Sequence, residues 1–329
     1  MKVLLTGTNG FIGKNLLSKL IHDFPDYAFN ILVRKDVELS DNPKIKYFKV
    51  NYLDVETIIN SGALENVELI FHVAGVTKSH TWEGFVKGNI RPVENLLLAV
   101  KKMHLKLKRF VLISSQSAGG PAEFEEHLKS ETERANPFDQ YGKSKLAAER
   151  IVESYGSVIP YTIIRPAGVF GPGDVDFLKI FQMTKTGISV YAGVKNKWVS
   201  LIYVEDLIEG IIKAAFSENT IGKVYNICED RPRTWKEIHN KIFEVAGKKK
   251  INISIPYYPI LWASYLGDLF SHLTGKTGIF NSNKILLSKP KYWIASNERA
   301  KKDFGFETKY KFGEAIKKTY EWYLKNQWL

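Results

Sequence analysis

The chain has 329 residues and a formal net charge of +12, and 44% of its residues are hydrophobic. This composition excludes a disordered protein, and no apolar run reaches the ~18–20 residues that a membrane span needs. The only cysteine, Cys228, excludes an intrachain disulfide and favours a reducing, cytoplasmic setting. The N-terminal apolar run is too short for a signal peptide.

The basic residues are scattered, and the densest group, KKMHLKLKR at 101–109, is typical of a helix end that runs into a strand. We interpret this group as a solvated face rather than a nucleic-acid patch. The sequence has no zinc-ligand spacing, RNA-binding signature or internal repeat. We therefore expect a small-molecule substrate, with no metal site and no nucleic-acid partner.

Short apolar runs alternate with helical patterns through the first half of the chain. Strands are predicted at 2–7, 29–34, 44–51, 67–75, 109–115 and 160–166, and helices at 15–24, 89–103 and 141–155. Fully apolar strands that alternate with helices indicate a parallel sheet covered on both faces. The predicted fold class is therefore α/β, with a doubly wound parallel sheet.

The first strand is followed by a glycine triplet in TGTNGFIG, formed by Gly7, Gly10 and Gly13. The first glycine permits a tight turn, the second lets the backbone approach a pyrophosphate, and the third lets helix and strand pack closely. The helix N-terminus adds free N–H groups and positive dipole potential. Residues 1–170 are therefore predicted to form a Rossmann-type domain that binds a nicotinamide dinucleotide.

The pattern becomes less regular from about residue 171. A strand is predicted at 198–204, an apolar run follows at 223–228, and helices are predicted at 205–216, 234–246 and 312–324. We expect residues 171–329 to form mainly a smaller, mostly helical substrate domain. Segments around 198–228 are expected to return to the Rossmann domain.

The end of the second strand bears on the choice between NAD and NADP. A carboxylate there binds the 2′-hydroxyl of NAD, whereas a basic residue suits the 2′-phosphate of NADP. This chain has Arg34 and Lys35 and no carboxylate, which favours NADP over NAD. The alternative is that Arg34 stacks on the adenine of either cofactor or is a basic surface residue.

The segment QYGKSKLAAERIV places Tyr141 and Lys145 four residues apart, on one face of a predicted helix. A phenol with a pKa of ~10 is a poor acid or base at neutral pH. A nearby ammonium group stabilises the phenolate and lowers that pKa, which makes proton transfer practical. Such pairs are also common on solvated helices, so this one gains weight from the glycine loop upstream.

Several segments together resemble the extended short-chain dehydrogenases/reductases, also called the NAD-dependent epimerase/dehydratase family. They are TGTNGFIG, HVAG, LISSQSAGG, YGKSK and RPAGVFGPGD, and the likeness continues through IYVEDLIEGI, KVYNICED and the C-terminal ERAKKDFGFETKYKFGEAIKKTYEWY. The resemblance covers nearly the whole chain. It implies hydride transfer between the nicotinamide and a carbinol carbon.

The resemblance also implies residue roles. Tyr141 matches the catalytic tyrosine, and Lys145 matches the lysine that binds the nicotinamide ribose and lowers the tyrosine pKa. The cofactor residues it implies are Gly7, Thr8, Asn9, Gly10, Phe11, Ile12, Gly13, Arg34, Lys35, Leu53, Ala74, Gly75, Asn89, Tyr141, Lys145, Pro166 and Val169. The substrate residues it implies are Thr77, Gln116, Ser117 and Gly168.

One departure from the family pattern concerns the adenine. Many relatives carry Asp–Leu after the third strand, and the matching pair here is read as Tyr52–Leu53, with Asp54 next. This change removes the expected adenine contact without removing cofactor binding.

Two further departures concern the substrate. Nucleotide-sugar epimerases and dehydratases often read R-x-x-N-x-Y-G-P after the sixth strand and carry an arginine before the YVED-like segment, both of which hold the diphosphate. This chain has Gly168 where the asparagine is expected, and the position expected for the arginine falls near Val199. By contrast, SSQSAGGP and the C-terminal segment resemble the 3β-hydroxysteroid dehydrogenase and dihydroflavonol reductase branches.

We therefore predict an oxidoreductase acting on a secondary alcohol or ketone. The alternatives are a nucleotide-sugar epimerase or dehydratase and a non-catalytic dinucleotide-binding scaffold. The aromatic-rich segment at 255–270 is interpreted either as internal packing or as a lid over an apolar substrate that contacts a membrane surface. The resemblance also implies a homodimer that pairs through the helices at 89–103 and 141–155.

Each of the three serines in LISSQSAGG is a candidate for the hydroxyl that orients the substrate in this family. Alignment on the strand and on the following Gly–Pro places Ser115 at the position used in the dehydrogenase branch. Epimerases often use the next position, which is Gln116 here. Strand alternation directs Ser114 to the opposite face, and Ser117 shares the face of Ser115 only if the chain stays extended.

Overall fold

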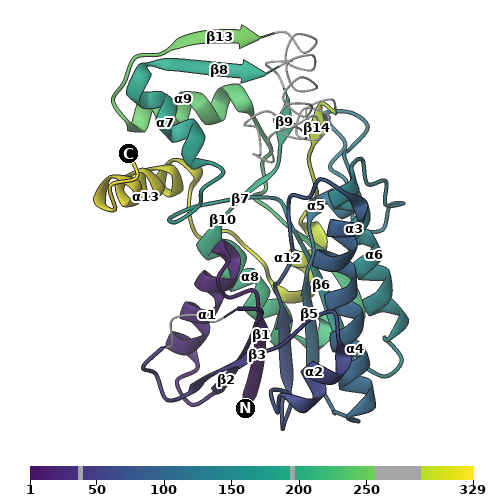
Figure 1. The fold of residues 1–329 in the computed structure, drawn as a ribbon. Helices are drawn as coiled ribbons and strands as arrows, with labels where there is room; N and C mark the ends of the chain where they lie inside the picture. The colour runs from purple at the N-terminus through teal and green to yellow at the C-terminus, as the bar shows by residue number, and fades with distance from the viewer. Residues whose placement is uncertain (36–39, 193–196, 256–289) are drawn as a thin grey trace.

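A computed structural model describes residues 1–35, 40–192, 197–255 and 290–329. Its main sheet has seven parallel strands in the order β11-β6-β5-β4-β1-β2-β3 (Figure 1). These strands are β1 (Lys2–Thr6), β2 (Ala28–Val33), β3 (Ile45–Lys49), β4 (Leu69–His72), β5 (Arg109–Ile113), β6 (Tyr161–Pro166) and β11 (Lys223–Ile227). The predicted α/β class and doubly wound sheet are confirmed.

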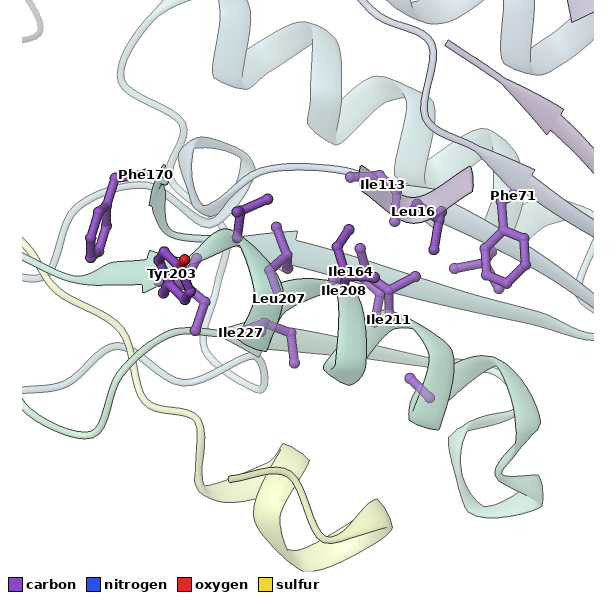
Figure 2. Close-up of a cluster of buried hydrophobic side chains, with 14 of the residues drawn as sticks. Leu16, Phe71, Ile113, Ile164, Phe170, Tyr203, Leu207, Ile208, Ile211 and Ile227 are labelled. Carbon is purple, nitrogen blue, oxygen red and sulfur yellow. The ribbon is translucent and has the colours of Figure 1, made fainter. Parts of the chain in front are cut away.

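Helices cover both faces of this sheet (Figure 1). One face carries α1 (Phe11–Asp23) and α8 (Val204–Phe216), and the other carries α2 (Val55–Asn60), α4 (Arg91–Lys102) and α6 (Gln140–Ser154). Strand alternation divides the buried side chains between the two faces, since Val3 and Leu5 join one apolar cluster and Leu4 joins the other. Figure 2 shows the first cluster, in which Ile208 and Ile211 of α8 lie beside Ile164 of β6.

The helix predicted at 89–103 begins differently in the structure. The chain first forms α3 (Trp82–Phe85), then a π-helical turn at Val86–Ile90, and only then α4. The wider π turn contains Asn89, whose side chain is almost fully buried. Such bulges frequently mark functional sites.

The strand predicted at 198–204 is wrong as a single element. Two short strands take its place, β9 (Trp198–Val199) and β10 (Leu201–Tyr203), and α8 begins at the next residue. β9 pairs with β12 (Arg233–Thr234) and β14 (Tyr292–Trp293), whereas β10 pairs with β7 (Gly168–Phe170). Ser200 separates them, because its N–H donates to the Trp293 carbonyl while its own carbonyl accepts from Gly168.

The remaining C-terminal elements combine helices with one further small sheet. They are α7 (Leu178–Thr186), β8 (Ile188–Ala192), α9 (Trp235–Val245), β13 (Ile251–Ile255), α12 (Glu298–Phe304) and α13 (Phe312–Lys325), with a 3-10 turn at Glu218–Thr220. In the described ranges no helix combines the length and apolar character required to cross a bilayer. The aromatic segment predicted as a lid lies outside the described residues from position 256 onward.

Candidate active site

A cavity of about 1180 Å³ lies along the carboxyl ends of the parallel strands. It runs over the loops that follow β1, β2, β3, β4, β5 and β6 and includes the point between β1 and β4 where the strand order reverses. Ligands of open α/β sheets bind at this kind of switch point. The cavity exceeds the ~300–1,000 Å³ of an ordinary small-ligand pocket, so a dinucleotide and a substrate fit together.

The glycine loop has the geometry that a dinucleotide requires. Gly7 has φ +73°, and a Cβ there would lie 2.5 Å from the Ala74 nitrogen. A Cβ at Gly13 would lie 2.1 Å from the Gly7 carbonyl oxygen, so only glycine permits this approach of α1 to the turn. Gly10 begins α1 without a side-chain cap, and the first turn holds no carboxylate. The N–H groups of this helix therefore suit a pyrophosphate.

The end of the cavity beyond β2 and β3 is basic. Arg34 and Lys49 line it, whereas Lys35 is exposed outside the lining. Among the described residues, the only carboxylates in the lining are Asp174 and Asp176, which follow β7. This end therefore suits an anionic group.

The departure at Tyr52–Leu53 has a structural explanation. Tyr52 is buried, and its hydroxyl donates to the Leu32 carbonyl at 2.8 Å. Leu53 lines the cavity, and Asp54 instead caps α2 by accepting from the Glu56 N–H. The neighbouring Asn51 also lines this part of the cavity. Sequence reasoning did not suggest Asn51.

Tyr141 and Ser115 form the wall of the cavity at the end of β5. Asp139 caps α6 by accepting from the Gly142 N–H at 2.9 Å, which fixes the turn that presents Tyr141. A Cβ at Gly142 would lie 2.3 Å from the Ser117 carbonyl, so this glycine lets α6 approach the serine loop. Burial raises the pKa of Tyr141, and a hydrogen bond with Ser115 offsets part of that rise.

The Lys145 ammonium lies directly behind the cavity wall. Its Nζ donates to the Ile113 carbonyl at 2.7 Å, and burial lowers its pKa to about 8. A Cβ at Gly75 would lie 3.7 Å from this Nζ and 3.0 Å from Asn89 Oδ1. Because Gly75 has no side chain, Lys145 and Asn89 can lie close to the part of the cavity that Gly75 lines.

Asn89 connects three segments. Its Oδ1 accepts from the Val76 N–H at 2.7 Å, and its Nδ2 donates to the Val76 carbonyl at 3.0 Å and to Ser144 Oγ at 2.8 Å. Ser144 in turn donates to the Tyr141 carbonyl at 2.7 Å. Asn89 thus fixes the loop after β4 against the helix that carries Tyr141 and Lys145.

Behind Lys145 lies a buried ion pair that sequence reasoning missed. Glu149 accepts from Arg165 through two hydrogen bonds, at 2.9 and 2.6 Å, and also from the Ser114 hydroxyl. The side chains of Glu149 and Arg165 are 1% and 6% exposed. The signal available was spacing, because Tyr141, Lys145 and Glu149 lie at i, i+4 and i+8 on one helix face.

Two of the four residues predicted to contact the substrate line the end of the cavity nearest Tyr141. Thr77 and Gly168 line the cavity, as do Asp174, Asp176 and Phe177, which the sequence did not suggest. Gln116 and Ser117 lie outside the lining, since the chain enters α5 (Gln116–Gly119) at this point and is no longer extended.

Most predicted cofactor residues come together in this cavity. Asn89 and Lys145 lie just behind its wall, and Lys35 lies apart from it. The lining contains Gly7, Thr8, Asn9, Gly10, Phe11, Ile12, Gly13, Arg34, Leu53, Ala74, Gly75, Tyr141, Pro166 and Val169.

Residues 3–228 match one family model, that of the NAD dependent epimerase/dehydratase family. The ceramide reductase of Caulobacter vibrioides is 26% identical, covering 99% of this chain and 96% of the relative. A 3 beta-hydroxysteroid dehydrogenase/Delta 5-->4-isomerase of Mycobacterium tuberculosis is 30% identical, covering 78% of this chain and 72% of the relative.

Solved structures agree with the fold. The dTDP-glucose 4,6-dehydratase of Bacillus anthracis, in complex with NAD, matches with a TM-score of 0.80 at 19% identity, covering 99% of this chain and 97% of the other. A mutant UDP-glucuronic acid 4-epimerase of Bacillus cereus, in complex with NAD and a fluorinated UDP sugar, matches with a TM-score of 0.78 at 21% identity, covering 99% of this chain and 100% of the other.

Proposed function

Because the chain belongs to the NAD dependent epimerase/dehydratase family, we propose that it is a reductase that donates a proton from Tyr141 to an apolar ketone. The observation that carries this proposal is the position of Tyr141 in the cavity wall, with Ser115 beside it and Lys145 behind it. This arrangement also supports an enzyme rather than a non-catalytic scaffold. The same groups work in the oxidative direction when the proton moves back to Tyr141.

The electrostatics support the reductive direction. Burial raises the pKa of Tyr141, so the phenol carries its proton at neutral pH, and the hydrogen bond with Ser115 lowers the cost of releasing it. Ser115 lies beside that hydroxyl, where it orients and polarises a carbonyl oxygen. The Lys145 ammonium lies one helical turn further along α6 and would stabilise the phenolate left after donation.

The residues of the glycine loop, together with Ala74, Gly75, Asn89 and Lys145, would hold a nicotinamide dinucleotide. When bound, that group supplies or accepts the hydride. Within the chain, the free N–H groups of α1 would hold the pyrophosphate, and Pro166, which lines the cavity, would lie at the nicotinamide end. Tyr141 then needs only to exchange a proton.

The cavity near Tyr141 supports an uncharged substrate. Gly168 has no side chain to hold a diphosphate, and a Cβ there would lie 3.0 Å from Leu201 Cδ2, so a larger side chain would require Leu201 to shift. Val199 is buried in the apolar core. Asp174 and Asp176 line this end, and Lys78 pairs with Asp176 at 3.1 Å. Two carboxylates disfavour a diphosphate.

Two of the relatives act on lipids according to their names, a ceramide reductase and a hydroxysteroid dehydrogenase. Together with the lack of a diphosphate-binding side chain at Gly168, these names support a lipid-like ketone as the substrate class. The alternative, a nucleotide-sugar epimerase or dehydratase, is supported by a dTDP-D-glucose 4,6-dehydratase of Dictyostelium discoideum that is 28% identical over 77% of this chain.

A substrate panel separates the two functions. We expect net consumption of NADPH with long-chain or steroid-like ketones and none with UDP- or dTDP-sugars. Nicotinamide absorbance follows the reaction, and sugar products are analysed in parallel. Interconverted sugars without net absorbance change would establish the alternative, because the cofactor is then reduced and reoxidised within one cycle.

Replacing Ser115 with alanine is expected to lower kcat by roughly 10²–10³-fold, the usual effect of losing a donor to a developing oxyanion. Affinity for the dinucleotide should stay nearly unchanged, because the cofactor contacts lie elsewhere. Ser117→Ala is the matched control and should keep wild-type turnover, since Ser117 lies outside the cavity lining. Wild-type rates in Ser115→Ala would contradict the assignment.

We propose NADP as the preferred cofactor, supported by Arg34 and Lys49 at the basic end of the cavity. Arg34→Ala is expected to weaken NADPH binding by roughly 10–100-fold, the value of a charge-assisted hydrogen bond, with little effect on NADH. Lys35→Ala is the control, because Lys35 is exposed outside the lining. Calorimetry measures both affinities, and equal wild-type affinity for NADH and NADPH would refute the preference.

We also propose a homodimer and a cytoplasmic setting. α4 and α6 pack side by side on one face of the sheet and offer half-buried side chains such as Leu98 and Ile151 to a partner. Light scattering that gives a monomer would refute the dimer. Cys228 is buried, with its Sγ donating to the Ala295 carbonyl at 3.3 Å, which is consistent with a reducing compartment.

A further inference from the structure

The two-stranded sheet of β8 and β13 exposes an aliphatic face. The strands are parallel, with Ile251 opposite Ile188 and Ile253 opposite Val190. Ser189 and Tyr191 are buried and point inward, where they contact His239 of α9. Because side chains alternate along a strand, the residues between them point outward.

Exposure follows this alternation on β8, whereas all five residues of the edge strand β13 are exposed. The exposed fractions are 37% for Ile188, 69% for Ile251, 43% for Ile253 and 37% for Ile255, and Val190 is half-buried. In Figure 1 the sheet lies at the end of the molecule farthest from the N-terminus, with α7 and α9 on its inner side. Five neighbouring aliphatic side chains therefore share this outer face, and such exposed apolar surfaces often mark interaction sites. We call it the β8–β13 face.

A basic cluster lies where the two strands begin. The Ile251 N–H donates to the Gly187 carbonyl at 2.8 Å, which brings Lys248 and Lys249 close to Lys185 at the end of α7. These three lysines are exposed. The segments 177–192 and 245–255 contain five lysines and no aspartate or glutamate. The end of the β8–β13 face is therefore strongly positive.

We propose that the β8–β13 face docks on an anionic lipid surface, with the isoleucines entering the interface and Lys185, Lys248 and Lys249 contacting the headgroups. Apolar side chains beside a cluster of lysines are the combination that binds peripherally to acidic membranes. A second copy of the chain fits less well, because its formal net charge of +12 offers no excess of negative charge to the lysine cluster.

The test is sedimentation of the full-length protein with vesicles. Wild type is expected to sediment with phosphatidylcholine vesicles that contain phosphatidylglycerol, to bind pure phosphatidylcholine weakly, and to dissociate at high salt. Lys248→Glu with Lys249→Glu should weaken binding by about 25-fold or more, because each basic residue contributes roughly fivefold near an anionic surface. Ile251→Ser with Ile253→Ser should weaken it by about 10-fold or more.

Matched controls make the same chemical changes elsewhere. Lys101→Glu with Lys106→Glu makes the same change of charge at two exposed lysines, one in the last turn of α4 and one in the loop before β5. Ile221→Ser alters an isoleucine that is 40% exposed. These variants should bind like wild type, and the melting temperature verifies that all variants are folded. Binding is measured without turnover, so it does not depend on the reaction proposed above.

Three results would overturn the proposal. The first is wild-type protein that does not bind anionic vesicles. The second is an equal loss of binding in the control variants, which would indicate a nonspecific effect of net charge. The third is wild-type protein that self-associates without binding lipid while the isoleucine variants are monomeric, which would identify the face as an interface between copies.

Discussion

Replacing Tyr141 with phenylalanine is expected to lower turnover by roughly 10²–10⁴-fold, the usual contribution of a positioned general acid. The substitution removes only the hydroxyl, which lies in the cavity wall beside Ser115. The ring itself stays and keeps its contact with Phe85, whose centroid is 6.3 Å away. Affinity for the dinucleotide should therefore change little while proton transfer is lost.

Steady-state kinetics and cofactor titration together measure this effect. Tyr155→Phe is the matched control, because Tyr155 follows the same helix at its far end, away from the cavity. This control is expected to keep wild-type turnover. If Tyr141→Phe keeps wild-type kcat on the ketone that the panel identifies, Tyr141 is not the proton donor.

The parts of the site that the sequence predicted depend on local geometry. Gly7 and Gly13 are separated by one turn and the start of one helix, so their spacing alone indicates the close approach of α1 to the turn. Tyr141 and Lys145 lie one helical turn apart for the same reason. Such motifs need no knowledge of which strand neighbours which.

The parts that the sequence did not predict depend on contacts between distant segments. Glu149 on α6 meets both Arg165 on β6 and Ser114 beyond β5 only because the sheet places β5 next to β6. Likewise, Ser200 ends β9 because the Trp293 carbonyl and the Gly168 N–H lie on either side of it. Neither arrangement has a local sequence signal.

The ion pair of Glu149 and Arg165 is expected to dominate the stability of this region. Arg165→Met should lower the free energy of unfolding by about 3–5 kcal/mol, because it leaves the Glu149 carboxylate buried without its partner. The urea midpoint at constant m-value measures the loss. Arg91→Met is the control, since Arg91 and Glu94 form an exposed pair whose removal costs at most about 1 kcal/mol.

A double variant distinguishes the lost charge partner from lost packing. Adding Glu149→Gln to Arg165→Met removes the unpaired charge and keeps an acceptor for the Ser114 hydroxyl. Most of the stability should return, because replacing a whole buried pair is far less costly than removing one member. If the double variant is as unstable as Arg165→Met, the arginine stabilises the fold through its packing. If Arg165→Met unfolds at the wild-type midpoint, the pair makes no net contribution and the prediction is wrong.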